Sequence, residues 1–578
     1  MSLLDKASLI ITPNAYKESK LYSVIPSNGD GDMTVVRATT ATRVNEAGLI
    51  EVVPRNLLSY SEQFDNASWI NSGATITPNT TIAPNGTLTA DTLGILSGQY
   101  LYQNIAITSS NIYTISIYVK VLSGTKQFKF NVYGSGNNFT SSAYTATTQW
   151  QKFNYTFIAT GTGGAGIYPL IVDGLTGGDF YIWGAQFENF ATATDYFPTT
   201  DRLNIPRIDY TGGGCPSILV EPQRTNVHLN SDNFSVSDGI SGCAITSNVE
   251  ISPDGNMNAD KIQGNVSVTT FQVFNNITIA ASTIYTFSVF AKAGNTNFVQ
   301  LSCTNMDTET NAVFDLSLGT ITLTGANSNP TITNYGNGWY RCSVNMVAQT
   351  TDLSGRFRIY VPADGSGSIW VGSASNGKNI FLYGRQLEAG SNATSYIPTV
   401  ASSVTRNADV ISKTGISGLI GQTEGTLFLD FELQPNNINA NYLFSLSDGT
   451  SSNLIRSEIY ILSPTVSYFR TGITTSGVSQ GENFTTITQL RNKMAISYSL
   501  NNLKLFINGV LVYNDNTVTI PAMTGFYLGN RNSFSNIIGS SYKQAILFKT
   551  RLSNAELEYM TSYRSLNEMV RQLNLKAL

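Results

Sequence analysis

The chain contains a long internal duplication, and this feature constrains its fold more than any other. A motif G-x-Q-φ-E, where φ is an apolar residue, begins at Gly184 and returns at Gly384. In both places A-T-x-Y-φ-P-T follows at the same distance, starting at Ala193 and at Ala393. Matching letters at matching spacing indicate two copies of one folding unit.

Other landmarks recur in the same order in both copies. The matched pairs are Asn56 with Asn226, Phe64 with Phe234, Pro84 with Pro253, Asp91 with Asp260, Tyr113 with Tyr285, and Trp150 with Trp339. Aromatic or β-branched residues alternate with small polar ones after Tyr113 and after Tyr285, which is the period of a half-buried strand. Turn-forming clusters recur and long helical periods are missing. The pattern predicts a jelly-roll β-sandwich for each copy, at 56–200 and 224–400, with a linker at 201–223.

A third region follows a second linker at 401–424. Residues 426–433 alternate as a strand does, and Asn508-Gly509 lies between two apolar runs, a strong hairpin signal. We expect a further sandwich over 425–552. Residues 553–578 are predicted to be helical, because Ser553 and Glu556 form a capping box. The apolar spacing that follows fits either a short coiled-coil seam or a helix that packs back on its own sandwich or on a neighbour.

The composition excludes several classes of function. Only 12% of residues are charged and the net charge is −4, so there is no basic surface for nucleic acid. No apolar run reaches the ~18 residues of a membrane span. Four scattered cysteines indicate buried free thiols rather than disulfides or zinc; they are Cys215, Cys243, Cys303 and Cys342. The first residues lack the pattern of a secretory signal, so we expect synthesis in a cytosol without export by that route.

The repeated motifs resemble the carbohydrate-binding-module-like jelly rolls of bacteriophage fibre and spike proteins. Residues 41–51 and 206–226 are similar to segments of phage tail proteins. In the third region, an opening strand, an L-x-φ-x-I-N-G hairpin from Leu503 and a closing φ-L-S-x-A-E-L resemble the concanavalin A/laminin-G-like lectin sandwich. With this resemblance the expected fold class is all-β: tandem jelly-roll sandwiches, then a concanavalin A-like sandwich and a short C-terminal helix.

The resemblance implies a function as well as a fold. It implies a tail or head fibre of a phage virion, a homotrimer, that adheres to host-cell or mucosal glycans and is not an enzyme. Residues 1–55 would attach it to other virion proteins or mediate oligomerisation. The virion would be assembled in the bacterial cytoplasm and released by lysis. A purely structural capsid or tail decoration protein and a polysaccharide-degrading spike are the alternatives.

Few residues are candidates for chemistry, and none is assigned a catalytic role. The single histidine, His228, has Leu58 as its counterpart in the first copy, which indicates an incidental histidine. Two carboxylates alone would suffice for a glycosidase. The repeated acids, however, lie in motifs common to both copies, which favours a structural role.

The same acids are the only candidate metal ligands. They are Asp91, Glu188, Asp260 and Glu388. No cofactor is predicted. The one metal these residues could hold is a structural calcium, because carboxylate oxygens suit this ion and some carbohydrate-binding jelly rolls hold one.

Glycan binding would use exposed aromatic rings beside planar polar groups. The candidates are Trp69, Trp183, Trp339 and Trp370. Because repeated aromatics in strands are more typical of a core, we expect ligand contacts where the copies differ, around residues 134–144 and 307–327.

Overall fold

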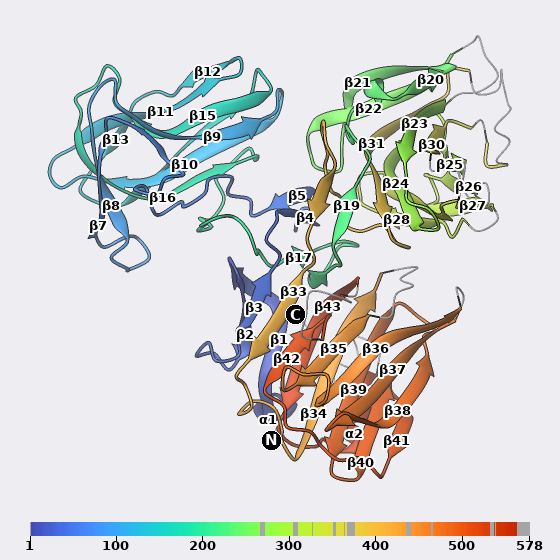
Figure 1. Cartoon of the computed structure of the whole chain (residues 1–578). Coiled ribbons are helices and arrows are strands. Elements are labelled where there is room, and N and C mark those ends of the chain that lie inside the picture. Colours follow the sequence, from blue (N-terminus) through green and yellow to red (C-terminus); the bar gives the residue numbers. More distant parts are fainter. Residues whose placement is uncertain are drawn as a thin grey trace, which may run out of the picture. The chain divides into compact units, whose positions relative to one another are not determined.

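A computed structural model describes residues 2–265, 272–304, 310–325, 328–350, 354–362, 364–366, 376–434, 441–463, 466–531, 537 and 539–562. Their regular structure is almost entirely antiparallel strands, which confirms the all-β prediction (Figure 1). The exceptions are the helices α1 (Leu3–Lys6) and α2 (Asn554–Thr561) and the 3-10 turn η1 (Phe234–Val236). The chain forms two compact units: 51–205 with 254–258, and the remainder.

The first copy is a sandwich of two sheets, ordered β14-β10-β16-β8-β7 and β12-β11-β15-β9-β6, with β13 paired to β11. Its strands are β6 (Ile70–Ser72), β7 (Thr75–Thr81), β8 (Ala90–Ile95), β9 (Tyr100–Ile107), β10 (Ile112–Lys120), β11 (Lys126–Gly134), β12 (Asn137–Thr140), β13 (Tyr144–Ala146), β14 (Gln151–Ile158), β15 (Gly163–Ile171) and β16 (Gly178–Glu188).

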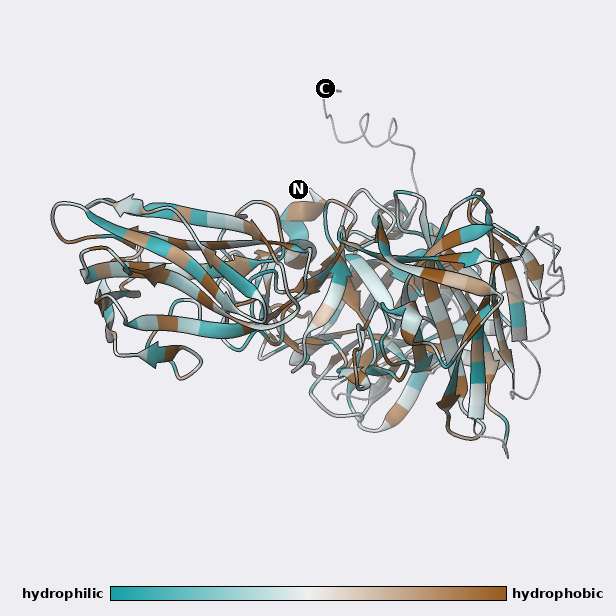
Figure 2. Cartoon of the chain, turned by 90° about the horizontal axis from the view of Figure 1, so that it is seen from above, coloured by the Kyte–Doolittle hydropathy of each residue, from teal (hydrophilic) through white to brown (hydrophobic). Residues whose placement is uncertain are grey.

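Alternation along these strands builds the core of the first copy. On β11, Phe128, Phe130 and Val132 are completely buried, whereas the residues between them face outward. This is the period of two that a pleated strand imposes. Figure 2 shows that hydrophobic and hydrophilic residues alternate along many strands.

The second copy repeats this arrangement, with sheets ordered β21-β22-β31-β24-β29-β28 and β20-β23-β30-β25-β26-β27, and a short β19-β32 pair. Its strands are β19 (Arg224–Asn226), β20 (Gly239–Ser241), β21 (Cys243–Ile251), β22 (Met257–Gly264), β23 (Gln272–Thr278), β24 (Ile284–Ala293), β25 (Phe298–Thr304), β26 (Thr310–Asp315), β27 (Thr320–Thr324), β28 (Thr331–Asn334), β29 (Trp339–Val347), β30 (Ser354–Tyr360), β31 (Asn379–Ala389) and β32 (Val404–Arg406).

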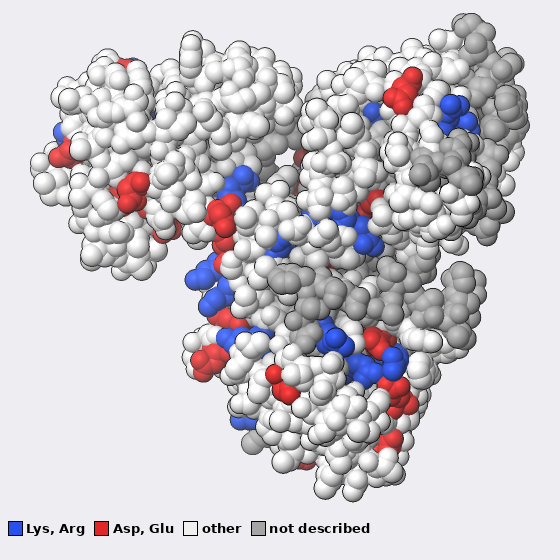
Figure 3. All heavy atoms as spheres, viewed as in Figure 1, with Lys and Arg blue, Asp and Glu red and all other residues white. Residues whose placement is uncertain are grey.

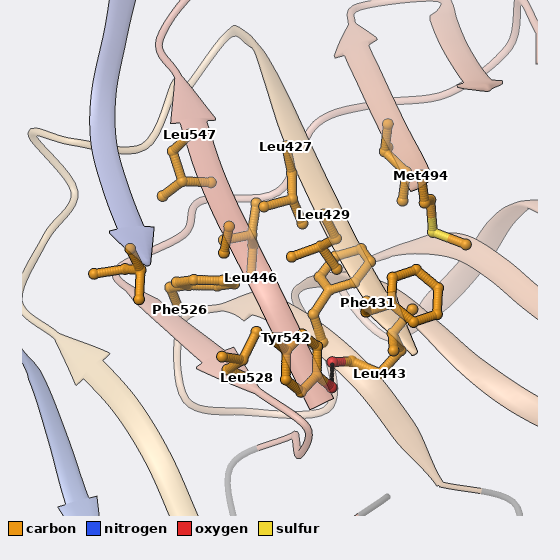
Figure 4. Packing of buried hydrophobic residues seen from close by; sticks show 14 of the residues in the cluster. Leu427, Leu429, Phe431, Leu443, Leu446, Met494, Phe526, Leu528, Tyr542 and Leu547 are labelled. Carbon is orange, nitrogen blue, oxygen red and sulfur yellow. Dashed lines mark hydrogen bonds between the residues drawn. The ribbon is translucent and has the colours of Figure 1, made fainter. Parts of the chain in front are cut away.

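The C-terminal sandwich is one continuous sheet, ordered β38-β37-β36-β35-β42-β33-β3-β2-β1-β43-β34-β39-β40-β41. Its later strands are β33 (Val410–Thr414), β34 (Glu424–Leu433), β35 (Tyr442–Ser447), β36 (Leu454–Ser463), β37 (Val466–Thr475), β38 (Val478–Thr486), β39 (Arg491–Ser499), β40 (Asn502–Ile507), β41 (Val510–Asp515), β42 (Gly525–Leu528) and β43 (Ser540–Phe548). Leu427, Leu429 and Phe431 of β34 enter its core, where the Tyr542 hydroxyl donates to the Leu443 carbonyl at 2.7 Å (Figure 4).

The N-terminal segment, predicted as a unit of its own up to residue 55, shares a sheet with the C-terminal region. The strands β1 (Ala7–Lys17), β2 (Lys20–Ile25) and β3 (Met33–Val36) lie inside the C-terminal sheet. Ile10 pairs with Ile546, and Val35 with Ile411. The backbone amides and carbonyls of a buried strand need hydrogen-bond partners. β43 provides them for β1, and β33 provides them for β3.

The two predicted linkers also contribute strands. β17 (Ile208–Asp209) and β18 (Ser217–Val220) form a hairpin, and β18 pairs with β43. β33 lies within the second predicted linker. The hairpin of β4 (Ala41–Val44) and β5 (Ile50–Val53) precedes the first copy.

A buried ion cluster ties these stretches together. Arg207 binds Glu221 at 2.7 Å and also contacts Asp409. Arg406 binds Glu221 at 2.6 Å, and Arg37 binds Asp409 at 2.8 Å. All five side chains are at most 2% exposed, so each charge depends on its partners for stabilisation. The guanidinium groups lower the pKa of the Glu221 and Asp409 carboxyls.

Several local predictions are confirmed. Asn508 and Gly509 join β40 to β41 with φ of 52° and 85°, as the Asn-Gly turn requires. The capping box of Ser553 and Glu556 starts α2, whose buried Leu557 packs on the C-terminal sheet. α2 ends at Thr561, and the rest of the proposed coiled-coil seam lies outside the described residues. The cysteines are free thiols, but Cys215 is exposed, unlike the predicted buried thiol.

Candidate functional site

Four tyrosines share one outer sheet face of the first copy, which we call the tyrosine face. Tyr100 and Tyr102 project from β9, Tyr168 from β15 and Tyr133 from β11. The first three are half-buried, and Tyr133 is 61% exposed. Large aromatic side chains gathered on an open sheet face are more typical of a ligand or partner site than of a solvated surface.

The pleat of β9 explains how this face arises. Leu101 and Gln103 point inward and are at most 4% exposed. The Gln103 amide holds the backbone of Ser59 through a pair of hydrogen bonds at 3.0 and 2.6 Å. Tyr100 and Tyr102, which alternate with these two residues, must therefore point to the opposite side.

The rings pack on one another and hold a fixed arrangement. Tyr102 and Tyr168 stack with centroids 4.6 Å apart, and Tyr100 meets the edge of Tyr168 at 5.8 Å. The Tyr100 hydroxyl donates to Oδ2 of Asp173 at 2.9 Å. The Tyr168 ring also lies over Gly166, because a Cβ there would come within 2.7 Å of the ring.

Polar groups border the rings. Asn104 is exposed and pairs across the sheet with Gly166. Asn131 pairs with Tyr168, and its amide donates to Thr140 Oγ1 at 2.8 Å. Lys129 donates to the Asp173 carbonyl at 3.1 Å.

Tyr100 and Tyr168 are neutral at physiological pH. The hydrogen bond with Asp173 raises the pKa of Tyr100, and burial together with the neighbouring tyrosines raises the pKa of Tyr168. Most of the surface visible in Figure 3 is likewise uncharged. The face therefore offers apolar rings, hydroxyls and amides, a mixture that suits a neutral polyhydroxylated ligand.

The same face of the second copy is chemically different. Phe274 pairs with Arg358, where the first copy stacks two tyrosines. The Arg356 guanidinium covers the Phe274 ring at 4.8 Å, and its Nε donates to Asn276 at 2.8 Å. In the second copy, Arg356 therefore covers the ring that corresponds to Tyr102 in the first copy.

The predicted metal ligands have structural partners in the protein. Asp91 accepts hydrogen bonds from the amides of Phe64 at 3.0 Å and Asn79 at 2.9 Å. Asp260 repeats this with Phe234 and Asn248, at 2.9 and 3.0 Å. Burial raises the pKa of both carboxyls. Each aspartate therefore fixes one preceding segment, at Phe64 or Phe234, and the neighbouring strand, β7 or β21, to its own strand.

The two glutamates fix the A-T-x-Y loop instead. Glu388 accepts from the amide and hydroxyl of Thr394 at 2.8 and 2.6 Å, and Glu188 contacts Thr194 likewise. Both are completely buried. Asp91 pairs with Ile182, six positions from Glu188 on β16, so the structure does not bring the acids of one copy together. Among the described residues no three His, Cys, Asp or Glu side chains are grouped to hold a metal.

The other candidates are core residues. Burial and Arg385 lower the pKa of His228 to about 3, and its Nδ1 lies 3.0 Å from the Leu229 carbonyl. Trp69, Trp183 and Trp339 are at most 5% exposed, which confirms their expected place in the core. Trp370 lies outside the described residues.

Sequence reasoning did not single out the tyrosine face. The available signal was Tyr100-Leu101-Tyr102, a strand with aromatic rings on the side opposite its aliphatic residue. The copies do differ here, but on strands; Tyr133 directly precedes the segment 134–144 that was expected to bind and lies outside it. The expected segment at 307–327 lies partly outside the described residues.

Comparisons with known proteins find remote structural matches. No family model matches the chain, and no curated protein is significantly similar. The N-terminal CBM22-1–CBM22-2 tandem domain of Paenibacillus barcinonensis Xyn10C matches at 13% identity and TM-score 0.19, over 61% of this chain and 100% of that one. The Ruminococcus gnavus IT-sialidase CBM40, bound to α2,3-sialyllactose, matches at 17% identity and TM-score 0.20, over 25% and 84%. Similarity at this level assigns neither family nor ligand.

None of the helices in the described part of the chain is long and apolar enough to cross a membrane.

Proposed function

We propose that this chain is a non-catalytic glycan-binding protein whose first copy binds a neutral oligosaccharide on the tyrosine face. The observation that carries the proposal is the set of four tyrosines on one open face, bordered by Asn104 and Asn131. The apolar faces of sugar rings stack on aromatic rings, while hydroxyls exchange hydrogen bonds with amides and phenols.

The biological setting is part of the same proposal. The chain acts in the virion of a bacteriophage, as a trimeric tail or head fibre that adheres to host-cell or mucosal glycans. It is assembled in the bacterial cytoplasm and released by lysis. The motifs shared with phage fibre proteins support this setting. Electron microscopy of phage particles labelled with an antibody against the protein tests it, and particles without label would contradict it.

Replacing Tyr102 by alanine tests the glycan site. Removing this ring exposes one side of Tyr168 and is expected to weaken binding about tenfold or more, which corresponds to ~1.4 kcal/mol. The measurement is a glycan array followed by titration calorimetry of the purified full chain with the bound oligosaccharide.

Tyr460→Ala is the matched control, because Tyr460 is 38% exposed on β36 of the C-terminal sandwich. This variant is expected to bind as the unaltered chain does. Equal losses in both variants would contradict a glycan site on the tyrosine face. No binding of the unaltered chain to any glycan would instead favour a purely structural decoration protein. Release of reducing ends from host polysaccharide would favour the degrading spike.

A further inference from the structure

The two copies carry the same aromatic cluster on the sheet opposite the tyrosine face. In the first copy it consists of Tyr118, Trp150, Tyr181, Trp183 and Tyr196, and in the second copy of Phe290, Trp339, Phe381, Tyr383 and Tyr396. Hydrogen bonds show the equivalence. Nε1 of Trp150 donates to the Ile82 carbonyl and Nε1 of Trp339 to the Ile251 carbonyl, both at 2.9 Å.

In the second copy this cluster is covered by a hairpin from the same chain. Val44 of β4 and Ile50 of β5 belong to the same hydrophobic cluster as Phe290 and Trp339. The Ile50 amide donates to the Pro253 carbonyl at 2.9 Å. Tyr335 and Arg341 also contact the Phe290 ring, at 4.9 and 5.2 Å. With the hairpin in place, Phe290 and Trp339 are at most 1% exposed.

In the first copy the same face is open. Tyr118, Trp150 and Tyr181 are only half-buried. Among the described residues no backbone amide donates to the carbonyl of Pro84, the counterpart of Pro253. The first copy thus has the aromatic floor and the backbone acceptor, but no hairpin of this kind within residues 51–205.

The charge on the open face indicates which charge a segment bound there should have. In the second copy Lys292 is paired with Glu250 at 3.0 Å. In the first copy the counterpart of Glu250 is Thr81, and Lys120 lies over the rings of Trp150 and Tyr181, at 4.9 and 5.4 Å. A hairpin with an acidic residue would complement this lysine.

The two similar hairpins of this chain, β4–β5 and β17–β18, both already pack on other parts of it. The β4–β5 hairpin covers the second copy, and the similar β17–β18 hairpin is bound to the C-terminal sheet through β18 and β43. A second copy of the chain therefore offers no spare hairpin of this type. We propose that the open aromatic face of the first copy binds a β-hairpin of a different protein, with two aliphatic side chains placed as Val44 and Ile50 are and an acidic residue beside them.

A peptide tests the proposal directly. The probe is a backbone-cyclised peptide of residues 42–53, titrated into the full chain and followed by tryptophan fluorescence and calorimetry. We expect saturable one-to-one binding with Kd below about 1 mM, equivalent to ~4 kcal/mol. A peptide with aspartate in place of both Val44 and Ile50 is expected not to bind.

Variants locate the binding face. Tyr118→Ala is expected to weaken peptide binding at least tenfold, and Tyr181→Ala provides a second test if Tyr118→Ala unfolds. Tyr102→Ala, on the opposite sheet, should leave it unchanged, which separates this site from the glycan site.

Four results would overturn the proposal. The first is no saturable binding at 1 mM peptide, and the second is that Tyr118→Ala and Tyr181→Ala bind the peptide as tightly as the unaltered chain does. The third is loss of glycan binding in these two variants, and the fourth is self-association of the unaltered chain that these variants abolish. The third would assign the face to glycan and the fourth to a second copy.

Discussion

At the scale of single residues, burial decides which side chains can act. The repeated acids that suggested a metal site hold neighbouring segments of the backbone. Asp91 and Asp260 bind two backbone amides each, and Glu188 and Glu388 bind the threonine of the A-T-x-Y loop. A carboxylate that accepts such hydrogen bonds in a buried place contributes to stability and is inaccessible to a substrate.

His228 gives a pH-dependent stability that replacement should remove. Its pKa is about 3 in the folded chain and ~6.5 when unfolded, so between these values the unfolded chain binds more protons. Stability is therefore expected to fall as pH decreases from about 6.5 toward 3, by up to ~1.4 kcal/mol per pH unit. Urea unfolding at pH 7, 6 and 5 measures this loss.

His228→Leu, which copies the buried Leu58 of the first copy, is the comparison. Because the chain has one histidine, the variant is expected to lose little stability from pH 7 to 5. The same decline in both proteins would show that other groups cause it.

At the scale of elements, a strand's face depends on the residues across from it. Gly166 lies between Asn104 and Tyr133 on neighbouring strands and pairs with both. Because it has no side chain, there is space above its backbone on this face of the sheet. The Tyr168 ring lies in this space and completes the tyrosine face. A glycine in a strand often marks such a close approach.

Gly166→Ala is expected to displace the Tyr168 ring and reduce glycan binding at least about tenfold, with a change of no more than ~1 kcal/mol in stability. Titration calorimetry and thermal unfolding measure the two effects. Gly164→Ala is the control, since a Cβ at Gly164 meets nothing within 4 Å. Normal binding by Gly166→Ala would exclude Tyr168 from the site.

At the scale of the whole molecule, the N-terminal strands complete the C-terminal sandwich. β1 lies between β2 and β43, and β3 pairs with β33, so residues 7–36 fill the middle of the sheet. Leu9, Ile11, Leu21, Met33 and Val35 belong to its hydrophobic core. The buried cluster of Arg37, Arg207, Glu221, Arg406 and Asp409 fixes the same stretches.

A fragment of residues 401–562 is therefore expected not to fold alone. It lacks the strands between β33 and β43 and leaves the carboxylate of Asp409 without Arg37 and Arg207. Amide dispersion in NMR spectra and resistance to proteolysis measure folding. A fragment of residues 51–205 is the control, because it has its own continuous core and is expected to fold. A folded 401–562 fragment would show that the N-terminal strands are dispensable.

Local sequence patterns are sufficient to predict the β class, the duplication, the Asn508-Gly509 hairpin and the capping box of α2. These features depend on local periodicity and turn chemistry, which a chain carries along its own length. Strand pairing, in contrast, is visible only in the folded chain. β1–β3 pair within the sheet formed by residues 410–548, and the presumed linkers contribute residues to the hydrophobic core. The tertiary structure also decides which aromatics are covered: Trp339 lies under a hairpin from residues 41–53, while its duplicate Trp150 is half-exposed. Pairing and burial depend on contacts between residues far apart in the chain, and no local pattern records them.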